Sequence, residues 1–305
     1  MKTRILGLFL SLFTLANSSA QTTIKSAVTD SELVANFIQP DSKSVRPGII
    51  VLGGSGGGIN WQNSIAELLA ENGYSALALA YFGMEGLPQY LSEIPLEYFE
   101  KALNWLRSHP QVDSERIGVI GVSKGGELAL LLASLFPDLK VVVVYVPSNV
   151  IFQSIAKDFS KTSSWSYHNR PLPFVPYKIT ENFNPDNLAE MYDESLEQEE
   201  YLEKAVIRVE NIKGPILLLS GKEDKVWPST KMSQMIMERL KRHKFHYAYE
   251  HKAYENAGHL ISWIDHPEPT KRGGTKEGMD FAQKDSRKRF LKFFKRHLKN
   301  QVYKK

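Results

Sequence analysis

The sequence predicts an α/β protein with a mostly parallel central sheet and helices on both of its faces. Short apolar runs alternate with amphipathic runs along most of the chain, as in successive strand–helix–strand units. One apolar run, residues 117–122, passes straight into a helical pattern through a glycine-flanked serine. The 305 residues, of which 42% are hydrophobic, suffice for a sizeable core in one large domain or two small ones.

The N-terminus predicts an export leader. Met1-Lys-Thr-Arg4 is basic, residues 5–16 are apolar, and Ser18-Ser-Ala20 supplies small residues before Gln21. The apolar run is shorter than the ~20 residues of a membrane span. We therefore expect a signal peptide over residues 1–20, a mature domain over 21–305, and a periplasmic or secreted location; the alternative is a buried first helix. The chain has no cysteine, which excludes disulfides and a lipid-anchored leader.

The first half of the mature chain follows a strand–helix order. A leading strand or hairpin is expected near residues 32–37. Leu96, Phe99, Leu103 and Leu106 recur at helical spacing and define one buried stripe. The predicted strands are 48–52, 74–80, 117–122 and 140–146, and the predicted helices are 61–72, 96–108 and 127–136.

Residues 147–209 interrupt this alternation. They begin with an aromatic and proline-rich stretch that has neither helical nor strand periodicity, and an acidic helical segment follows at 194–204. Connections of this length are usually functional. We therefore predict a cap insertion over the functional site, and the simpler alternative is a long surface connection.

The alternating pattern resumes after the insertion. Strands are predicted at 215–220 and 245–249, with a helix at 229–242 between them. A glycine-bearing loop, Asn256-Ala-Gly-His259, follows the second of these strands. A last amphipathic helix carries Phe290, Phe294 and Leu298 on one face.

Gly121-x-Ser123-x-Gly125 is the pattern of a nucleophile elbow. Glycine is needed on both sides of the serine because the turn from strand to helix is so tight that larger side chains would clash. Ser123 would lie at a helix N-terminus, where free N–H groups favour developing negative charge. The pattern predicts a nucleophilic serine, and the alternative is a glycine-rich turn.

A serine nucleophile needs a base, and the base needs an acid to orient it. In the arrangement built on such an elbow the chain order is Ser, Asp, His. Among eight histidines, His259 lies in a loop after the last predicted strand, where a parallel sheet presents its functional groups. Asp224 follows the strand that ends at residue 220, and Glu223 is its rival.

An acyl-transfer intermediate also needs donors for its oxyanion. The backbone N–H of Lys124 is one candidate, and the second is expected near Ser55 in the glycine-rich loop 53–58. A phosphate-binding role for this loop is disfavoured, because the chain has no G-x-x-x-x-G-K-[ST] and no dinucleotide fingerprint. Neither H-E-x-x-H nor a cysteine–histidine cluster occurs, so we expect no metal and no cofactor.

Together these motifs resemble the C-terminal catalytic domain of the acyl-CoA thioesterases and bile acid-CoA:amino acid N-acyltransferases, within the α/β-hydrolases. The resemblance covers about residues 45–298. It is carried by the glycine-rich loop, Leu77-Ala-Leu-Ala-Tyr-Phe-Gly83, Leu87-Pro, Ile94-Pro-Leu-Glu-Tyr-Phe99, Ala102-Leu-Asn-Trp-Leu106, Gly121-Val-Ser-Lys-Gly-Gly-Glu-Leu-Ala129, Ser220-Gly-Lys-Glu-Asp-Lys-Val-Trp-Pro-Ser229, Asn256-Ala-Gly-His259 and Gly273-Gly-Thr275.

The resemblance implies that Ser123 is the nucleophile, Asp224 the acid and His259 the base. The N-acyltransferase members carry cysteine at the nucleophile, so the serine is similar to the thioesterase side. Two features depart from the family. Residues 21–45 are too few for the N-terminal β-sandwich of its better-known members, and a leader separates an exported enzyme from cytosolic coenzyme A thioesters.

We therefore expect a hydrolase of acyl thioesters or esters, with the role in fatty acid metabolism that the resemblance implies. Trp165, Tyr167 and Phe174 of the insertion would shape an apolar acyl pocket. The alternatives are an N-acyltransferase or amidase that uses the same triad, and a catalytically inactive exported binding protein. A formal net charge of +4, or +2 without Lys2 and Arg4, is too small to indicate a nucleic-acid partner. The oligomeric state is left open.

Overall fold

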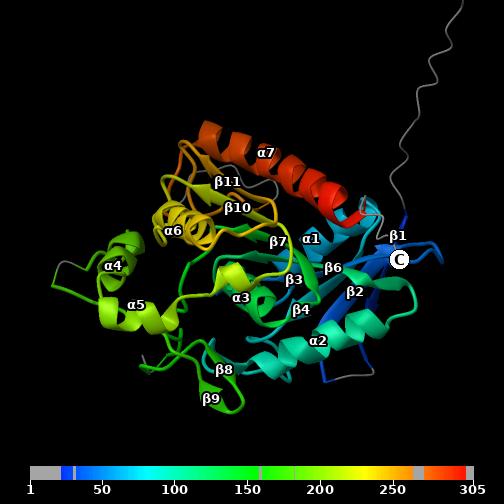
Figure 1. The fold of residues 1–305 in the computed structure, drawn as a ribbon, viewed down its shortest axis with the longest axis horizontal. Helices are drawn as coiled ribbons and strands as arrows, with labels where there is room; N and C mark the ends of the chain where they lie inside the picture. The colour runs from blue at the N-terminus through cyan, green and yellow to red at the C-terminus, as the bar shows by residue number, and fades with distance from the viewer. Residues whose placement is uncertain (1–21, 30–31, 158–159, 182, 264–270, 300–305) are drawn as a thin grey trace, which may run out of the picture.

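The computed structural model describes residues 22–29, 32–157, 160–181, 183–263 and 271–299; the predicted leader over residues 1–20 lies outside them. An eight-stranded sheet forms the centre of the molecule in the order β1-β2-β4-β3-β6-β7-β10-β11 (Figure 1). Its strands are β1 (Thr23–Ala27), β2 (Val34–Pro40), β3 (Arg46–Leu52), β4 (Ser75–Ala80), β6 (Val112–Val122), β7 (Leu139–Tyr145), β10 (Ile216–Gly221) and β11 (Tyr249–Tyr254).

Six of these strands run parallel, from β4 at one side to β11 at the other. The β1–β2 hairpin extends the sheet beyond β4 with antiparallel pairing. The hairpin expected near residues 32–37 is thereby confirmed, as is the mostly parallel sheet.

Helices cover both faces of the sheet, as predicted (Figure 1). On one face, α2, α3 and α6 form a core with the side chains of β3 and β6 that lie on that face. On the other face α1 and α7 form a second core. The helices are α1 (Asn60–Glu71), α2 (Leu96–Ser108), α3 (Lys124–Leu135), α4 (Leu188–Ser195), α5 (Glu199–Ala205), α6 (Ser229–Arg242) and α7 (Lys276–Phe294), with a 3₁₀ turn η1 (Val209–Asn211) and a π-helical end η2 (Lys295–Lys299).

The period of two along each central strand divides its side chains between the cores. In β3, Ile50 and Leu52 belong to the core with α2 and α3, and Ile49 and Val51 belong to the core with α1 and α7. Both sets are buried, so the strand is an unbroken apolar run in the sequence. This is why the central strands were predictable.

The last strand differs from its prediction, which placed it at residues 245–249. Phe245, Tyr247 and Tyr249 alternate as in a strand, yet Lys244 has a left-handed φ of 53° and the chain joins the sheet only at Tyr249. There Ile216 pairs with Tyr249 and Gly221 with Tyr254. β11 is an edge strand with little apolar character, which concealed it in the sequence.

The insertion of residues 147–209 is built from short elements. β8 (Trp165–Tyr167) and β9 (Arg170–Pro171) join β5 (Ile94–Pro95), which lies just before α2, in a small separate sheet. The acidic segment forms two helices, α4 and α5, which project to the side of α6 (Figure 1). A third core that includes Phe152, Tyr192 and Trp227 binds the insertion to the loop before α6.

No helix among the residues that the structure describes combines the length and the apolar character that crossing a membrane requires.

The β10–β11 pairing contains a partly buried histidine, which makes stability depend on pH. His251 Nε2 lies 2.8 Å from Ser220 Oγ, and burial lowers the pKa of His251 to about 4. In the unfolded chain the pKa of histidine is about 6.5, so between these two values the unfolded state binds more protons. The free energy of unfolding should therefore fall as pH drops from about 6.5 to about 4.

We expect His251→Gln to remove part of this dependence, because glutamine does not titrate. Urea unfolding of both proteins at pH 7.5 and pH 5 measures it. If the wild type loses no more stability than His251→Gln over this interval, the inference about His251 is wrong.

Candidate active site

Ser123 is the single residue between the end of β6 and the start of α3. Its φ of 56° and ψ of −122° form an unusual backbone conformation for a residue with a side chain. A Cβ on Gly121 would lie 2.0 Å from the carbonyl oxygen of Gly125, and one on Gly125 would lie 2.2 Å from that of Gly53. Only glycine fits at either position, which is the physical reason for the predicted elbow pattern.

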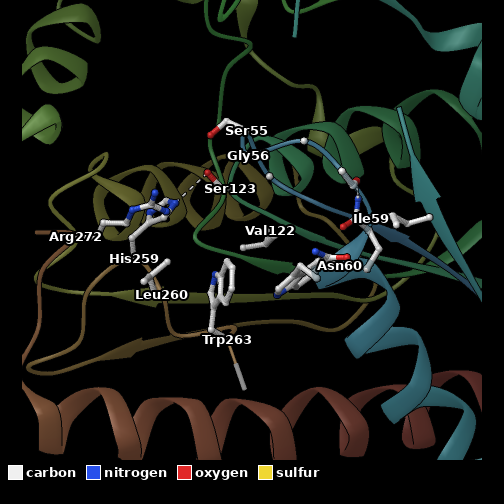
Figure 2. Close-up of a pocket in the computed structure, with 15 residues that line it drawn as sticks. Ser55, Gly56, Ile59, Asn60, Val122, Ser123, His259, Leu260, Trp263 and Arg272 are labelled. Atoms are coloured by element: carbon white, nitrogen blue, oxygen red, sulfur yellow. Dashed lines mark hydrogen bonds between the residues drawn. The ribbon is translucent and has the colours of Figure 1, made fainter. Parts of the chain in front are cut away.

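The structure brings together the three residues predicted to cooperate. His259 Nε2 lies 3.0 Å from Ser123 Oγ (Figure 2). On the other side of the ring, His259 Nδ1 lies 2.9 Å from Asp224 Oδ2 and 3.0 Å from Oδ1. All three side chains are at least nine-tenths buried. The rival acid, Glu223, is exposed.

Asp224 is held in place by three further donors. Its Oδ1 accepts the backbone N–H groups of Val226 at 2.9 Å and Trp227 at 3.3 Å, and its Oδ2 accepts Ser229 Oγ–H at 2.6 Å. These contacts fix the direction of the carboxylate. The His259 ring also lies edge-to-face against Trp227, 6.1 Å between centroids. The aspartate is thus oriented before any substrate arrives.

The loops that carry the acid and the base share an anchor. The carbonyl oxygen of Arg272 accepts N–H from His259 at 3.0 Å and from Lys225 at 3.3 Å. A further bond joins Glu223 N–H to the carbonyl of Ala257. The backbone at Arg272 therefore joins the loop of Asp224 to the loop of His259.

The predicted oxyanion donors lie at the elbow. The N–H of Lys124 is the first in α3 and has no acceptor within the helix. The loop 53–58 approaches from the opposite side: a Cβ on Gly54 would lie 3.2 Å from Ser123 Cβ, and Ser55 lines the cavity beside the serine. Tyr81 Oη–H donates to Gly53 O at 2.5 Å, and Gln62 Nε2 donates to Gly58 O at 2.9 Å, so both ends of the loop are held.

A cavity of about 450 Å³ opens beside Ser123 and His259 (Figure 2). It has a polar side made by the glycine-rich loop and a more apolar side made by two indoles and three aliphatic side chains. Arg272 lies at its rim next to the imidazole. The cavity is lined by Gly54, Ser55, Gly56, Gly57, Gly58, Ile59, Asn60, Trp61, Gln62, Val122, Ser123, His259, Leu260, Trp263 and Arg272.

The aromatic residues assigned to an acyl pocket, Trp165, Tyr167 and Phe174, are not among the residues that line this cavity. Trp165 is fully buried against Tyr81 and Phe99, while Tyr167 and Phe174 pack on the same core from outside. The described part of the insertion packs against the first turn of α3, and none of its residues lines this cavity. A local sequence pattern does not indicate on which side of Ser123 an aromatic segment far along the chain will pack.

Sequence analysis also missed Trp61, Trp263 and Arg272 as lining residues, although each lies close to a motif that it used. Trp61 follows the glycine-rich loop, Trp263 lies four residues after His259, and Arg272 precedes Gly273-Gly274. Among the described residues no group of three or more histidine, aspartate or glutamate side chains could hold a metal ion. Chemically, the arrangement is suited to nucleophilic attack by Ser123 with His259 as the base.

Comparisons with known proteins identify a family that this chain matches. Residues 94–300 match the family model described as "BAAT / Acyl-CoA thioester hydrolase C terminal". Acyl-coenzyme A thioesterase 6 of Mus musculus is 32% identical over 289 residues, covering 89% of this chain and 64% of that protein. Acyl-coenzyme A amino acid N-acyltransferase 1 of Mus musculus is 34% identical over 275 residues, covering 85% and 62%. The chain thus spans less than two thirds of these relatives.

Solved structures show the same fold at lower identity. The acylaminoacyl peptidase of Pyrococcus horikoshii superposes with a TM-score of 0.60 at 20% identity, covering 93% of this chain and 42% of that one. A dienelactone hydrolase-like phosphotriesterase from metagenomic libraries gives 0.55 at 17% identity, covering 92% and 99%. The central sheet and its helices are therefore those of the α/β-hydrolases.

The close approach at Gly125 gives a test of the elbow. Gly125→Ala should lower the free energy of unfolding by roughly 1–3 kcal/mol and slow labelling of Ser123 by a fluorophosphonate, because the added methyl group meets backbone that cannot rotate away. Gly56→Ala, where a Cβ meets nothing within 4 Å, is the matched control for stability. Labelling of Gly125→Ala is compared with that of the wild type. Equal stability of the two variants, with labelling of Gly125→Ala at the wild-type rate, would contradict the assigned geometry.

Proposed function

We propose that this chain, which belongs to the BAAT / acyl-CoA thioester hydrolase C-terminal family, hydrolyses acyl thioesters or esters through an acyl-enzyme on Ser123. The observation that carries the proposal is the hydrogen-bonded line from Ser123 Oγ through His259 to Asp224 at the edge of a cavity. Relatives named as acyl-coenzyme A thioesterases support the hydrolase assignment.

In the first half-reaction Ser123 Oγ attacks the carbonyl carbon of the substrate, and His259 Nε2 takes its proton. Asp224 stabilises the imidazolium that forms. The negative charge on the carbonyl oxygen is stabilised by the N–H of Lys124 and by an N–H of the loop at Gly54 and Ser55. The carbon–sulfur or carbon–oxygen bond then breaks, and the leaving group takes the proton from His259.

In the second half-reaction water enters where the leaving group was. His259 removes a proton from it, the resulting hydroxide attacks the acyl carbon, and Ser123 leaves with the proton as the carboxylic acid forms. An amine in place of water would give an amide, the reaction named for the N-acyltransferase relatives. A serine acyl-enzyme is generally passed to water, which favours hydrolysis.

The lining of the cavity suggests how the substrate lies. Ile59, Trp61, Leu260 and Trp263 offer an apolar surface for the acyl group, and Arg272 offers positive charge at the rim. The composition of residues 1–20 supports export, and an exported enzyme meets esters more readily than coenzyme A thioesters. We therefore propose a small acyl ester or thioester as substrate and leave the leaving group to experiment.

Ser123→Ala should reduce kcat for p-nitrophenyl esters and for acyl-CoA by at least about 10³-fold, because it removes the nucleophile. Asp224→Asn should cost a comparable factor by misorienting His259. Steady-state kinetics on the mature protein, with glycine or taurine present in a parallel set, gives both rates and products. Undiminished activity of Ser123→Ala would exclude the mechanism, and amide products would identify acyl transfer.

Trp263→Ala should raise KM for decanoyl esters about tenfold while leaving acetyl esters unchanged, because it removes apolar surface that only a long acyl group reaches. Phe281→Ala is the control, since Phe281 is an exposed aromatic residue of α7 outside the cavity lining. A chain-length series of p-nitrophenyl esters measures the effect. If Trp263→Ala changes KM equally for acetyl and decanoyl esters, the acyl group does not lie on this surface.

A further inference from the structure

A buried ion pair lies directly behind the nucleophile. Lys124 Nζ lies 2.8 Å and 3.0 Å from the two carboxylate oxygens of Glu127, and the two side chains are 1% and 0% exposed. Removing two such charges from water costs several kcal/mol for each ion, and a hydrophobic pair of similar size often gives equal stability. Stability alone therefore does not explain why charges occupy the first turn of α3.

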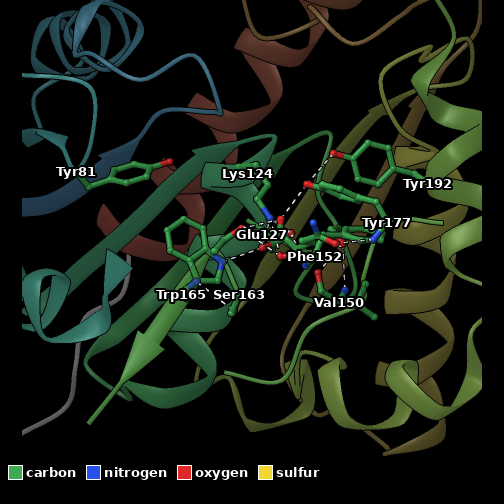
Figure 3. Close-up of polar contacts among 12 residues, drawn as sticks. Tyr81, Lys124, Glu127, Val150, Phe152, Ser163, Trp165, Tyr177 and Tyr192 are labelled. Carbon is green, nitrogen blue, oxygen red and sulfur yellow. Dashed lines mark hydrogen bonds and ion pairs between the residues drawn. The ribbon is translucent and has the colours of Figure 1, made fainter. Parts of the chain in front are cut away.

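The remaining hydrogen bonds of the pair come from the insertion (Figure 3). Trp165 Nε1–H donates to Glu127 Oε1 at 2.8 Å, and Phe152 N–H reaches Glu127 Oε2 at 3.4 Å. Lys124 Nζ in turn donates to Phe152 O at 3.4 Å and lies 5.8 Å from the centroid of the Trp165 ring. Two segments of the insertion, at Phe152 and at Trp165, therefore contact this ion pair in the first turn of α3.

Trp165 is also linked, through Tyr81, to the glycine-rich loop on the other side of Ser123. Its ring packs on Tyr81, with centroids 5.8 Å apart, and the Tyr81 hydroxyl donates to Gly53 O at 2.5 Å. Gly53 begins the glycine-rich loop, whose next residue touches Ser123. The indole is therefore linked to Lys124, which carries the first predicted oxyanion donor, through Glu127. Through Tyr81 it is linked to Gly53, two residues before Ser55, where the second donor is predicted.

The contacts of Lys124 matter because the stabilisation of an oxyanion depends on the exact positions of its N–H donors. The N–H that stabilises the intermediate belongs to Lys124, whose side chain the pair immobilises, and a misplacement of about 1 Å can cost on the order of 10² in rate. A buried, unpaired Glu127 would also place negative charge near the developing oxyanion, and Lys124 neutralises it.

We propose that Trp165, acting through the Glu127–Lys124 pair and through Tyr81, is a positioning residue by which the insertion holds the two oxyanion donors around Ser123. The inference rests on the proposed function. Trp165 does not line the cavity, so it acts on the rate of the chemical step and leaves substrate binding unchanged.

Trp165→Phe tests the proposal, because it deletes the indole N–H and keeps an aromatic ring against Tyr81. We expect kcat for p-nitrophenyl esters to fall at least about tenfold, KM to stay within about twofold, and the rate of fluorophosphonate labelling to fall in parallel with kcat. Glu127→Gln, which keeps the shape of the side chain and removes its charge, should show the same division between kcat and KM and serves if Trp165→Phe folds poorly.

Trp105→Phe is the matched control. It is the same substitution at a site near the C-terminal end of α2, where the Trp105 ring packs on Phe37 of β2. All assays are run well below the melting temperature of each variant. A kcat of Trp165→Phe within twofold of that of Trp105→Phe, in a protein whose activity Ser123→Ala abolishes, overturns the inference and leaves the proposed function standing.

If the wild type hydrolyses none of the substrates, the proposed function is rejected, and kinetics can no longer test the role of Trp165. Hydrogen exchange of the amides of residues 124–128 then tests whether Trp165 holds the first turn of α3. Faster exchange there in Trp165→Phe than in Trp105→Phe supports a hold of the insertion on the first turn of α3. Equal exchange in the two variants overturns it.

Discussion

The structure depends on the contact between backbone atoms on the two sides of Ser123. β6 ends and α3 begins within one residue, so the carbonyl of Gly125 occupies space that a side chain at Gly121 would need, and Gly125 itself lies against the end of β3. This close approach places the free N–H groups of a helix start beside a glycine-rich loop from a neighbouring strand. A left-handed backbone at a residue other than glycine persists only because the surrounding sheet and helix determine it completely.

The parallel sheet then determines where the other groups lie. Asp224 follows β10 and His259 follows β11, and the C-terminal ends of parallel strands meet along one edge. The two strands are neighbours in register, and the carbonyl of Arg272 accepts hydrogen bonds from both loops. The distance between acid and base is therefore set by backbone contacts, which vary less than the rotamers of long side chains.

The described residues of the insertion do not line the cavity, as those of a cap would. Its aromatic residues enter the core behind α3, and the exposed side of Ser123 is left to the loops after β3 and β11. Trp61, Leu260 and Trp263 line the cavity, and the insertion contributes a buried indole that completes the hydrogen bonding of a charged pair. A segment that supports the nucleophile from behind has the same composition as one that covers it, because both bury aromatic side chains.

The sequence by itself determined the class of fold and the order of strands and helices, and it predicted that Ser123, Asp224 and His259 act together. These features depend on local patterns: apolar runs buried on both faces, glycine where backbones meet, and functional groups just after strands. Only the tertiary structure decided that β11 begins at Tyr249, that Glu223 is exposed, that Trp165 lies behind the nucleophile, and that Lys124 and Glu127 form a buried pair. An edge strand lacks the apolar signature of its neighbours, and contacts such as that of Trp165 with Glu127 join residues 38 positions apart whose meeting no local pattern encodes.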